Sequence, residues 1–278
     1  MCFGFRRTDT WRRAHGPSPS CHLLVALACL LVLAREPRAE QASSIRDVTA
    51  AIAKGADSTG RREAIVDRLK AIGVEYKLQE FTTRKGLAGT NIVATVKGGP
   101  AGVVLIGAHY DRAPVGQGVV DNGASCAVLL ELLDALKRRE MRNYTVQTVF
   151  FDLEEGGLDG FGYGNSFFAT ASHPEGRLAR SLSRAAQASG IAVRFADAAH
   201  YPLSDHHNMV AAGIETLGIA LIDGAEVDAI MSGGQGPLPR VLTIMHTPKD
   251  ANDVLNAADV AAGTLGIERL LRLVDSGS

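Results

Sequence analysis

Histidines and carboxylates follow directly after three apolar runs of this sequence. His109 and Asp111 come after GVVLIGA, Glu154 and Glu155 come just after TVFF, and His246 comes after VLTIM. The carboxyl ends of the strands in an open α/β sheet converge on one crevice, so we expect these side chains to meet there. Each residue alone also suits a turn or a helix start, and it is their shared position at strand ends that favours a common site.

A further carboxylate, Asp121, lies twelve residues after His109 in the glycine-rich segment GQGVVDNGAS, which opens a helix. Imidazole and carboxylate groups without a thiolate form a nitrogen and oxygen donor set that suits zinc or a similar divalent ion. A carboxylate placed between two ions can bridge them, and the two ions together polarise a carbonyl and activate water. The residue types therefore predict a metal site.

The adjacent pair Glu154 and Glu155 allows a division of labour at such a site. One carboxylate can bind a metal while its free neighbour accepts the proton of a water molecule. His109 and Asp111 are two residues apart at a strand end, so their side chains point the same way. Asp111 can therefore orient the imidazole of His109 without binding the metal itself.

Apolar strands and amphipathic helices alternate along the chain and must position these residues. We expect helices at 43–55, 61–72, 124–139, 175–189 and 256–274, and strands at 76–82, 91–96, 102–108, 146–151, 167–171, 216–222 and 240–245. The continuous apolar run at 102–108 is typical of a strand buried on both faces. The alternation predicts the α/β class, as a three-layer sandwich whose helices flank a mostly parallel or mixed central sheet.

The N-terminal 39 residues have the organisation of a secretory signal peptide. Four arginines precede a short apolar run, LLVALACLLVLA, and small residues follow it, so cleavage is expected at Ala34 or Ala39. We therefore divide the chain into a leader, 1–39, and one domain, 40–278. Cys126 is the one cysteine outside the leader, so the exported domain is expected to have no internal disulfide and to lie in the periplasm or outside the cell.

Composition excludes two other classes of protein. The formal net charge is −1, with 29 basic and 30 acidic residues, so there is no basic field that would attract nucleic acid. No apolar run reaches the ~18–20 residues of a membrane span, so no membrane association is expected once the leader is removed. The oligomeric state cannot be read from the sequence.

Five segments, GAHYD, VVDNGAS, DLEEGGLDG, SDHHNM and HTPKD, occur in this order and resemble the M28 family of zinc metallopeptidases. Members of this family are mainly exported aminopeptidases, with related carboxypeptidases and glutaminyl cyclases. The resemblance extends from about Gly60 to the C-terminus. It implies a zinc-exopeptidase-like α/β fold with two zinc ions, or one ion in a cyclase-like member.

The resemblance also implies a role for each candidate residue. The metal ligands would be His109 for one ion, Asp121 as the bridge, and Glu155 and His246 for the other ion, with Glu154 as general base and Asp111 behind His109.

One departure from the family pattern concerns a further aspartate ligand. The family places it at the end of a strand that follows the Glu-Glu pair through a helix and a loop. Here only three residues separate Glu155 from Asp159, whereas a parallel crossover needs about 10–12 residues or more. Either Asp159 is this ligand, or residues 154–160 form the family's turn after the pair and the ligand is absent.

These observations predict a metal-dependent exopeptidase, most simply an aminopeptidase that removes N-terminal residues from a peptide substrate. A glutaminyl-cyclase-like transferase with a single zinc ion is one alternative. A catalytically impaired M28-like binding domain is another, and the short connection after Glu155 favours it.

Overall fold

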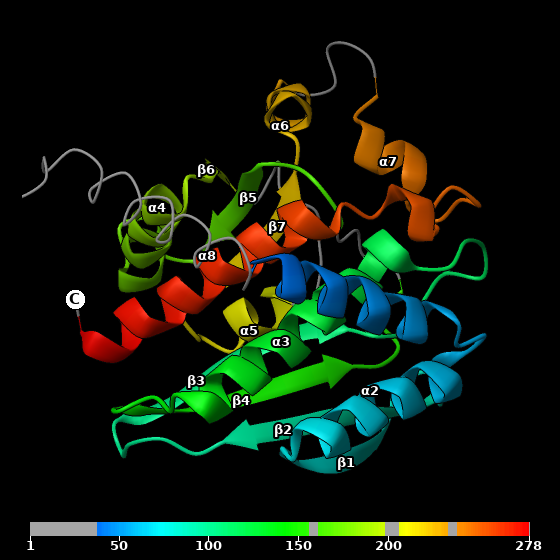
Figure 1. Ribbon diagram of the computed structural model, residues 1–278, viewed down its shortest axis with the longest axis horizontal. Helices are drawn as coiled ribbons and strands as arrows, with labels where there is room; N and C mark the ends of the chain where they lie inside the picture. Colours follow the sequence, from blue (N-terminus) through cyan, green and yellow to red (C-terminus); the bar gives the residue numbers. More distant parts are fainter. Residues whose placement is uncertain (1–37, 156–160, 198–205, 233–237, 278) are drawn as a thin grey trace, which may run out of the picture. The chain divides into compact units, whose positions relative to one another are not determined.

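Four strands form the larger of two hydrogen-bonded sheets in the computed structural model, which describes residues 38–155, 161–197, 206–232 and 238–277. In spatial order they are β1 (Glu75–Thr82), β2 (Ala88–Val96), β4 (Tyr144–Phe151) and β3 (Gly102–His109) (Figure 1). The pairs β1–β2 and β2–β4 are antiparallel, whereas β3 and β4 are parallel. The carboxyl ends of β3 and β4 therefore lie at the same edge of the sheet.

The smaller sheet has β5 (Ser166–Ala171) between β6 (Ala192–Ala196) and β7 (Leu217–Ile222). The β5–β6 pair is parallel and the β5–β7 pair is antiparallel. Consecutive residues of β5 point to opposite faces, and each face is covered. Phe167 belongs to a core with α4 (Arg177–Ser189) and α8 (Ala257–Ser276), whereas Phe168 packs with α6 (Gly224–Met231) and α7 (Arg240–Ile244).

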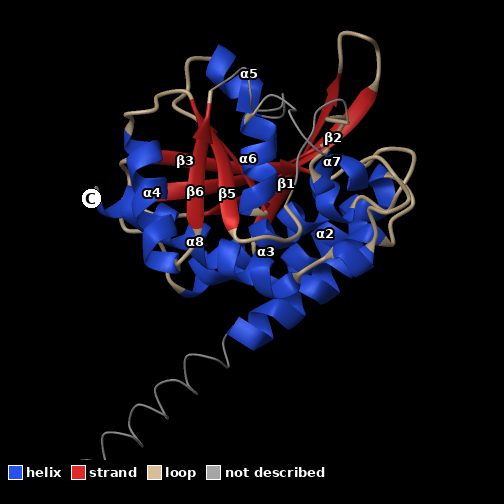
Figure 2. Ribbon diagram, turned by 90° about the horizontal axis from the view of Figure 1, so that it is seen from above, coloured by secondary structure: helices blue, strands red, loops and turns tan. Residues whose placement is uncertain are grey.

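Helices complete the layers of an α/β fold. Helices α2 (Ser58–Ile72), α3 (Ala124–Arg138) and α8 lie on the same side of the strands (Figure 2). The remaining helical segments include residues 38–53, which carry the buried Ile45 and Ile52. The short helical segments also include α5 (His206–Ala211), the π-helical η1 (Val119–Gly123) and the 3-10 helix η2 (Asn252–Val254). The α/β class with mixed sheets, predicted from the sequence, is confirmed.

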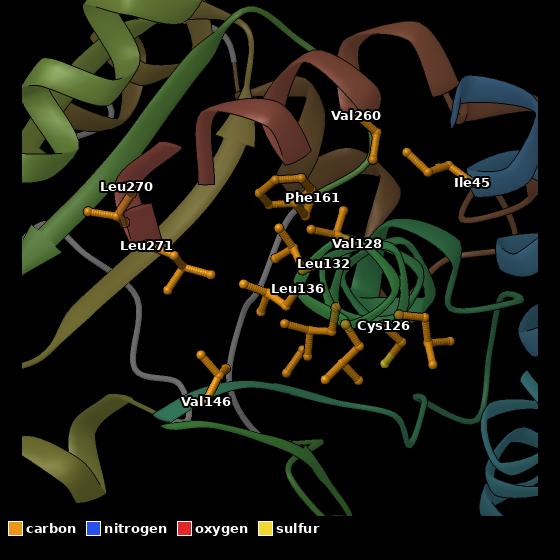
Figure 3. Close-up of a cluster of buried hydrophobic side chains, with 14 of the residues drawn as sticks. Ile45, Cys126, Val128, Leu132, Leu136, Val146, Phe161, Val260, Leu270 and Leu271 are labelled. Carbon is orange, nitrogen blue, oxygen red and sulfur yellow. The ribbon is translucent and has the colours of Figure 1, made fainter. Parts of the chain in front are cut away.

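The main core surrounds α3, which runs between the four-stranded sheet and α8. Figure 3 shows Leu132 and Leu136 of α3 between Val146 of β4 and the α8 residues Val260 and Leu271. All five side chains are buried. This packing fixes α3, and the segment that carries Asp121 leads directly into its first turn.

Replacing Leu132 with alanine is expected to lower the free energy of unfolding by about 2–5 kcal/mol, because the lost methyl groups leave a cavity in a fully buried position. Urea unfolding followed by circular dichroism measures the change. Leu78→Ala, at a side chain that is 51% exposed, is the control, and equal losses in the two variants would contradict this account of the core.

Two predictions about individual strands are wrong. Residues 240–245 form the helix α7 and the residue after it, not a strand, because a short apolar run carries no periodicity that separates a buried helix from a strand. The run at 102–108 is a strand, but it is not buried on both faces. Val103 and Leu105 point to the same face of the sheet and are 58% and 43% exposed, so the part of the chain that the structure describes leaves this face of β3 largely uncovered.

The predicted leader falls on residues 1–37, outside the described part of the chain, and on Arg38 and Ala39, which begin the helical residues 38–53. Within the described ranges, none of the helices combines the length and the apolar character needed to cross a membrane.

Candidate metal centre

The parallel strands β3 and β4 bring His109 and the glutamate pair together. His109 is the last residue of β3, is fully buried, and is in register with Phe151 at the end of β4. The chain then turns through Leu153, which has a φ of 63°, before Glu154 and Glu155. The expectation that strand ends deliver these side chains to one place is thus met for β3 and β4.

Asp121 enters the site from the segment between β3 and α3. It lies in η1 and is 2% exposed. Its two carboxylate oxygens point at different histidines. Oδ1 is 3.0 Å from His109 Nε2, and Oδ2 is 3.1 Å from His246 Nε2. Asp121 therefore lies between the two imidazoles.

His246 completes the cluster from the other side. It follows α7 rather than a strand and has a left-handed φ of 57°. Besides its contact with Asp121, its Nε2 is 3.0 Å from Oε2 of Glu155. Ile244 and Met245, which precede it, are buried in the core shared with α6 and β5. The predicted residues His109, Asp121, Glu155 and His246 thus form one connected cluster.

This cluster has the properties of a site for a divalent cation. Ligand atoms of His109, Asp121 and Glu155 lie within 4.8 Å of one another. Glu155 Oε1 is buried and has no hydrogen-bond partner among the described residues. Burial, together with the negative charge of Asp121, raises the pKa of Glu155. A bound cation would satisfy the buried oxygen and favour the ionised carboxylates, so the donor set fits a zinc ion.

Asp111 links His109 to the backbone of Glu155. Its Oδ1 is 3.3 Å from His109 Nδ1, and its Oδ2 accepts a hydrogen bond of 3.0 Å from the backbone N–H of Glu155. Burial by itself would raise the pKa of Asp111. The hydrogen bond and charge of His109 and the N–H groups of Glu155 and Glu154 outweigh this effect and lower the pKa. An ionised Asp111 fixes the ring of His109 so that Nε2 faces the cluster.

Glu154 lies beside His109 in the same cluster. Its Oε2 is 3.7 Å from His109 Nε2, and its side chain is partly exposed. The carboxylate is thus close to the candidate metal ligands while it keeps access to solvent. This is the position that a proton acceptor for water requires.

Two predicted features cannot be placed. Asp159 lies outside the described residues, as do Ser204 and Asp205 of the SDHHNM segment, while His206 begins the short helix α5. The chain after the undescribed stretch returns close to the site, because the N–H of Phe161 donates to the carbonyl of Val120, 3.3 Å away.

Sequence reasoning missed two buried charged residues that hold the segment before Asp121. Asp250 accepts hydrogen bonds from backbone N–H groups of this segment, and Arg61 donates to its carbonyls. Asp250 is the last residue of the HTPKD motif, so the motif drew attention to this position, but the sequence indicated a role only for His246. Arg61 lies on a helix rich in other charges, and nothing in the sequence distinguishes it from its neighbours.

Solved structures share this fold. A zinc aminopeptidase from Bacillus subtilis superposes with a TM-score of 0.55 at 19% identity, covering 67% of this chain and 50% of that chain. A glutaminyl cyclase from Porphyromonas gingivalis superposes with a TM-score of 0.65 at 20% identity, covering 83% of this chain and 97% of that chain. The protein therefore has the zinc-exopeptidase fold.

Sequence comparison specifies the family within this class. Residues 91–182 match the family model of Peptidase family M28. The probable lipoprotein aminopeptidase LpqL of Mycobacterium tuberculosis is 36% identical over 104 residues, which are 34% of this chain and 21% of that protein. The matched part of the chain spans about a fifth of the length of the first curated relatives. The matched stretch includes His109, Asp121, Glu154 and Glu155.

Proposed function

We propose that the protein is a metal-dependent exopeptidase, specifically a zinc aminopeptidase that releases N-terminal residues from peptides. The observation that carries this proposal is the position of Asp121, whose two oxygens face His109 and His246 separately. A carboxylate in this position can bridge two divalent ions, as peptide hydrolysis by a two-metal site requires. The family match and the relatives named as aminopeptidases support the same activity.

The positions of the side chains support a catalytic role for each of them. A divalent ion bound by these ligands supplies Lewis acidity, which polarises a peptide carbonyl and lowers the pKa of water. Glu154 accepts the proton of the water that attacks the scissile carbonyl and then returns it to the leaving amine. Asp111 keeps His109 oriented throughout, because it is tied to both the imidazole and the backbone of Glu155.

The number of ions depends on ligands beyond the described residues. The set of Asp121, Glu155 and His246 offers three side chains for one ion. A second ion would have His109 and Asp121 from the described residues, and we propose Asp159 as its further ligand. A site that holds one ion would favour the glutaminyl-cyclase-like alternative.

We also propose that the chain is exported. The basic and apolar character of the first 39 residues supports this location, as does the relative named a lipoprotein aminopeptidase. A peptide in the periplasm or outside the cell would then be the substrate.

One experiment separates the candidate functions. Zinc per folded monomer is measured by elemental analysis after gel filtration, and peptide products are identified by mass spectrometry. Two zinc ions with stepwise loss of N-terminal residues are the expected result. One zinc ion with loss of ammonia from an N-terminal glutamine would establish the cyclase instead. Folded protein that contains no zinc and cleaves no peptide would support the third alternative, a catalytically impaired binding domain.

A further inference from the structure

Asp250 holds the backbone of the segment that carries Asp121. Its Oδ1 accepts hydrogen bonds from the N–H groups of Val119 and Val120, at 2.9 and 2.7 Å, and its Oδ2 accepts one from the N–H of Asp121 itself, at 3.3 Å. Its side chain is buried, with 1% of the residue exposed. Since Asp250 is four residues after His246, these bonds tie the turn after one candidate ligand to the backbone of another.

Arg61 holds the same segment from the opposite direction. This residue of α2 is fully buried, and its guanidinium donates to the carbonyls of Gln117 and Gly118, at 2.9 and 3.0 Å. Its Nε also donates to the carbonyl of Tyr110, the residue after His109. A guanidinium can serve three carbonyls at once because its donors are arranged in a rigid plane.

Together the two side chains satisfy both kinds of backbone group in residues 117–121. The carbonyls of 117 and 118 bind Arg61, and the N–H groups of 119, 120 and 121 bind Asp250. Hydrogen bonds to charged groups are stronger than those between neutral groups, and here all but the partly buried bond to Gln117 are buried. These bonds therefore restrain the backbone of this segment relative to Arg61 and Asp250.

We propose that Arg61 and Asp250 are positioning residues that form a brace, which sets Asp121 between His109 and His246 at metal-binding distance. Arg61 contributes the link to the His109 segment, and Asp250 contributes the link to the His246 segment. The brace rests on the proposed function to the extent that it requires a metal site at Asp121. Neither side chain is itself proposed to touch metal or substrate.

The test compares two aspartates whose carboxylates each accept hydrogen bonds from three backbone N–H groups, one near the candidate metal site and one far from it. Asp250→Asn keeps an oxygen for two of the N–H groups but can place an amide donor against the N–H of Asp121. Asp275→Asn is the matched control. Asp275 is also buried and accepts three backbone N–H groups, from Arg142, Asn143 and Tyr144, at the start of β4 and thus at the other end of that strand from the site.

Zinc affinity of the full chain is measured by competition with a chromophoric chelator, and Co²⁺ absorption spectra report the ligand geometry. For Asp250→Asn we expect zinc binding to weaken about 10- to 100-fold, the usual effect of losing a partner that orients a metal ligand, and the Co²⁺ bands to shift. Asp275→Asn is expected to lower the unfolding temperature, because it also weakens hydrogen bonds to backbone N–H groups. It should leave the zinc affinity and the Co²⁺ spectrum at their wild-type values.

Several results would overturn the brace. Wild-type zinc affinity in Asp250→Asn would do so, and so would equal losses of affinity in both variants, because the effect would then be general destabilisation. If Asp250→Asn does not fold, Arg61→Lys decides by the same criteria, since a lysine ammonium cannot reproduce the planar arrangement of donors. A wild-type chain that binds no zinc would also overturn it.

These readouts do not need turnover, so the brace and the proposed function can fail separately. A wild-type chain that binds zinc and cleaves no peptide would refute the exopeptidase while the zinc comparison still decides the brace.

Discussion

Glu154→Gln is expected to keep zinc at wild-type stoichiometry and to lower kcat by about 10²–10⁴-fold, the usual contribution of a positioned proton acceptor. Glutamine has nearly the same shape as glutamate, but its amide cannot take a proton from water. The change removes the proposed proton acceptor without removing a proposed metal ligand. Steady-state hydrolysis of aminoacyl-p-nitroanilides and elemental analysis of the same sample give the two values.

The neighbouring glutamate provides the contrasting variant. Glu155→Gln replaces a carboxylate whose Oε2 contacts His246, so we expect it to lose zinc as well as activity. The two substitutions are chemically identical and one residue apart, so general effects of removing a charge cannot explain a difference between them. Hydrolysis by Glu154→Gln at the wild-type rate would refute the assignment of the general base.

Asp121→Asn is expected to weaken zinc binding by more than about 100-fold, because partners that only orient ligands are already worth 10- to 100-fold. The carboxylate faces both imidazoles, through different oxygens. An asparagine keeps one oxygen and presents an amide donor to the other histidine, so the bridge is lost while the shape of the side chain is retained. Equilibrium dialysis against buffered zinc measures the change.

Asp134→Asn is the control for this measurement. Asp134 lies on α3 and pairs with Arg138 near the surface, so its neutralisation should leave zinc binding unchanged. Zinc affinity within experimental error of wild type in Asp121→Asn would show that Asp121 is not a ligand.

The sequence allowed prediction of those site residues whose position follows from a single strand. His109 and the glutamates follow apolar runs, and the parallel pairing of β3 with β4 brings such ends together. His246 also lies in the cluster, although the element before it is a helix rather than the predicted strand. Its placement depends on packing around α7, which a run of five apolar residues does not reveal.

The brace could not be predicted because its partners are backbone atoms. The role of Arg61 depends on carbonyls of residues 110, 117 and 118, and peptide groups are identical in every residue. Only the folded chain shows which carbonyls face α2. The exposure of Val103 could not be predicted either. Whether one face of a strand is buried depends on which other segments pack against it, and the residues of the strand do not reveal this.

The position of β3 at the end of its sheet has a consequence for how chains meet one another. Among the described strands only β4 pairs with β3, so the other edge of β3 has N–H and C=O groups that no described strand binds, and Val103 and Leu105 add exposed apolar surface on the same strand. Protein sheets usually protect such edges with charged residues, prolines or bulges, and the sequence from 102 to 108 contains none of the charges or prolines. We therefore expect strand pairing between chains to increase as the protein concentration rises, so the tendency to aggregate depends on this strand.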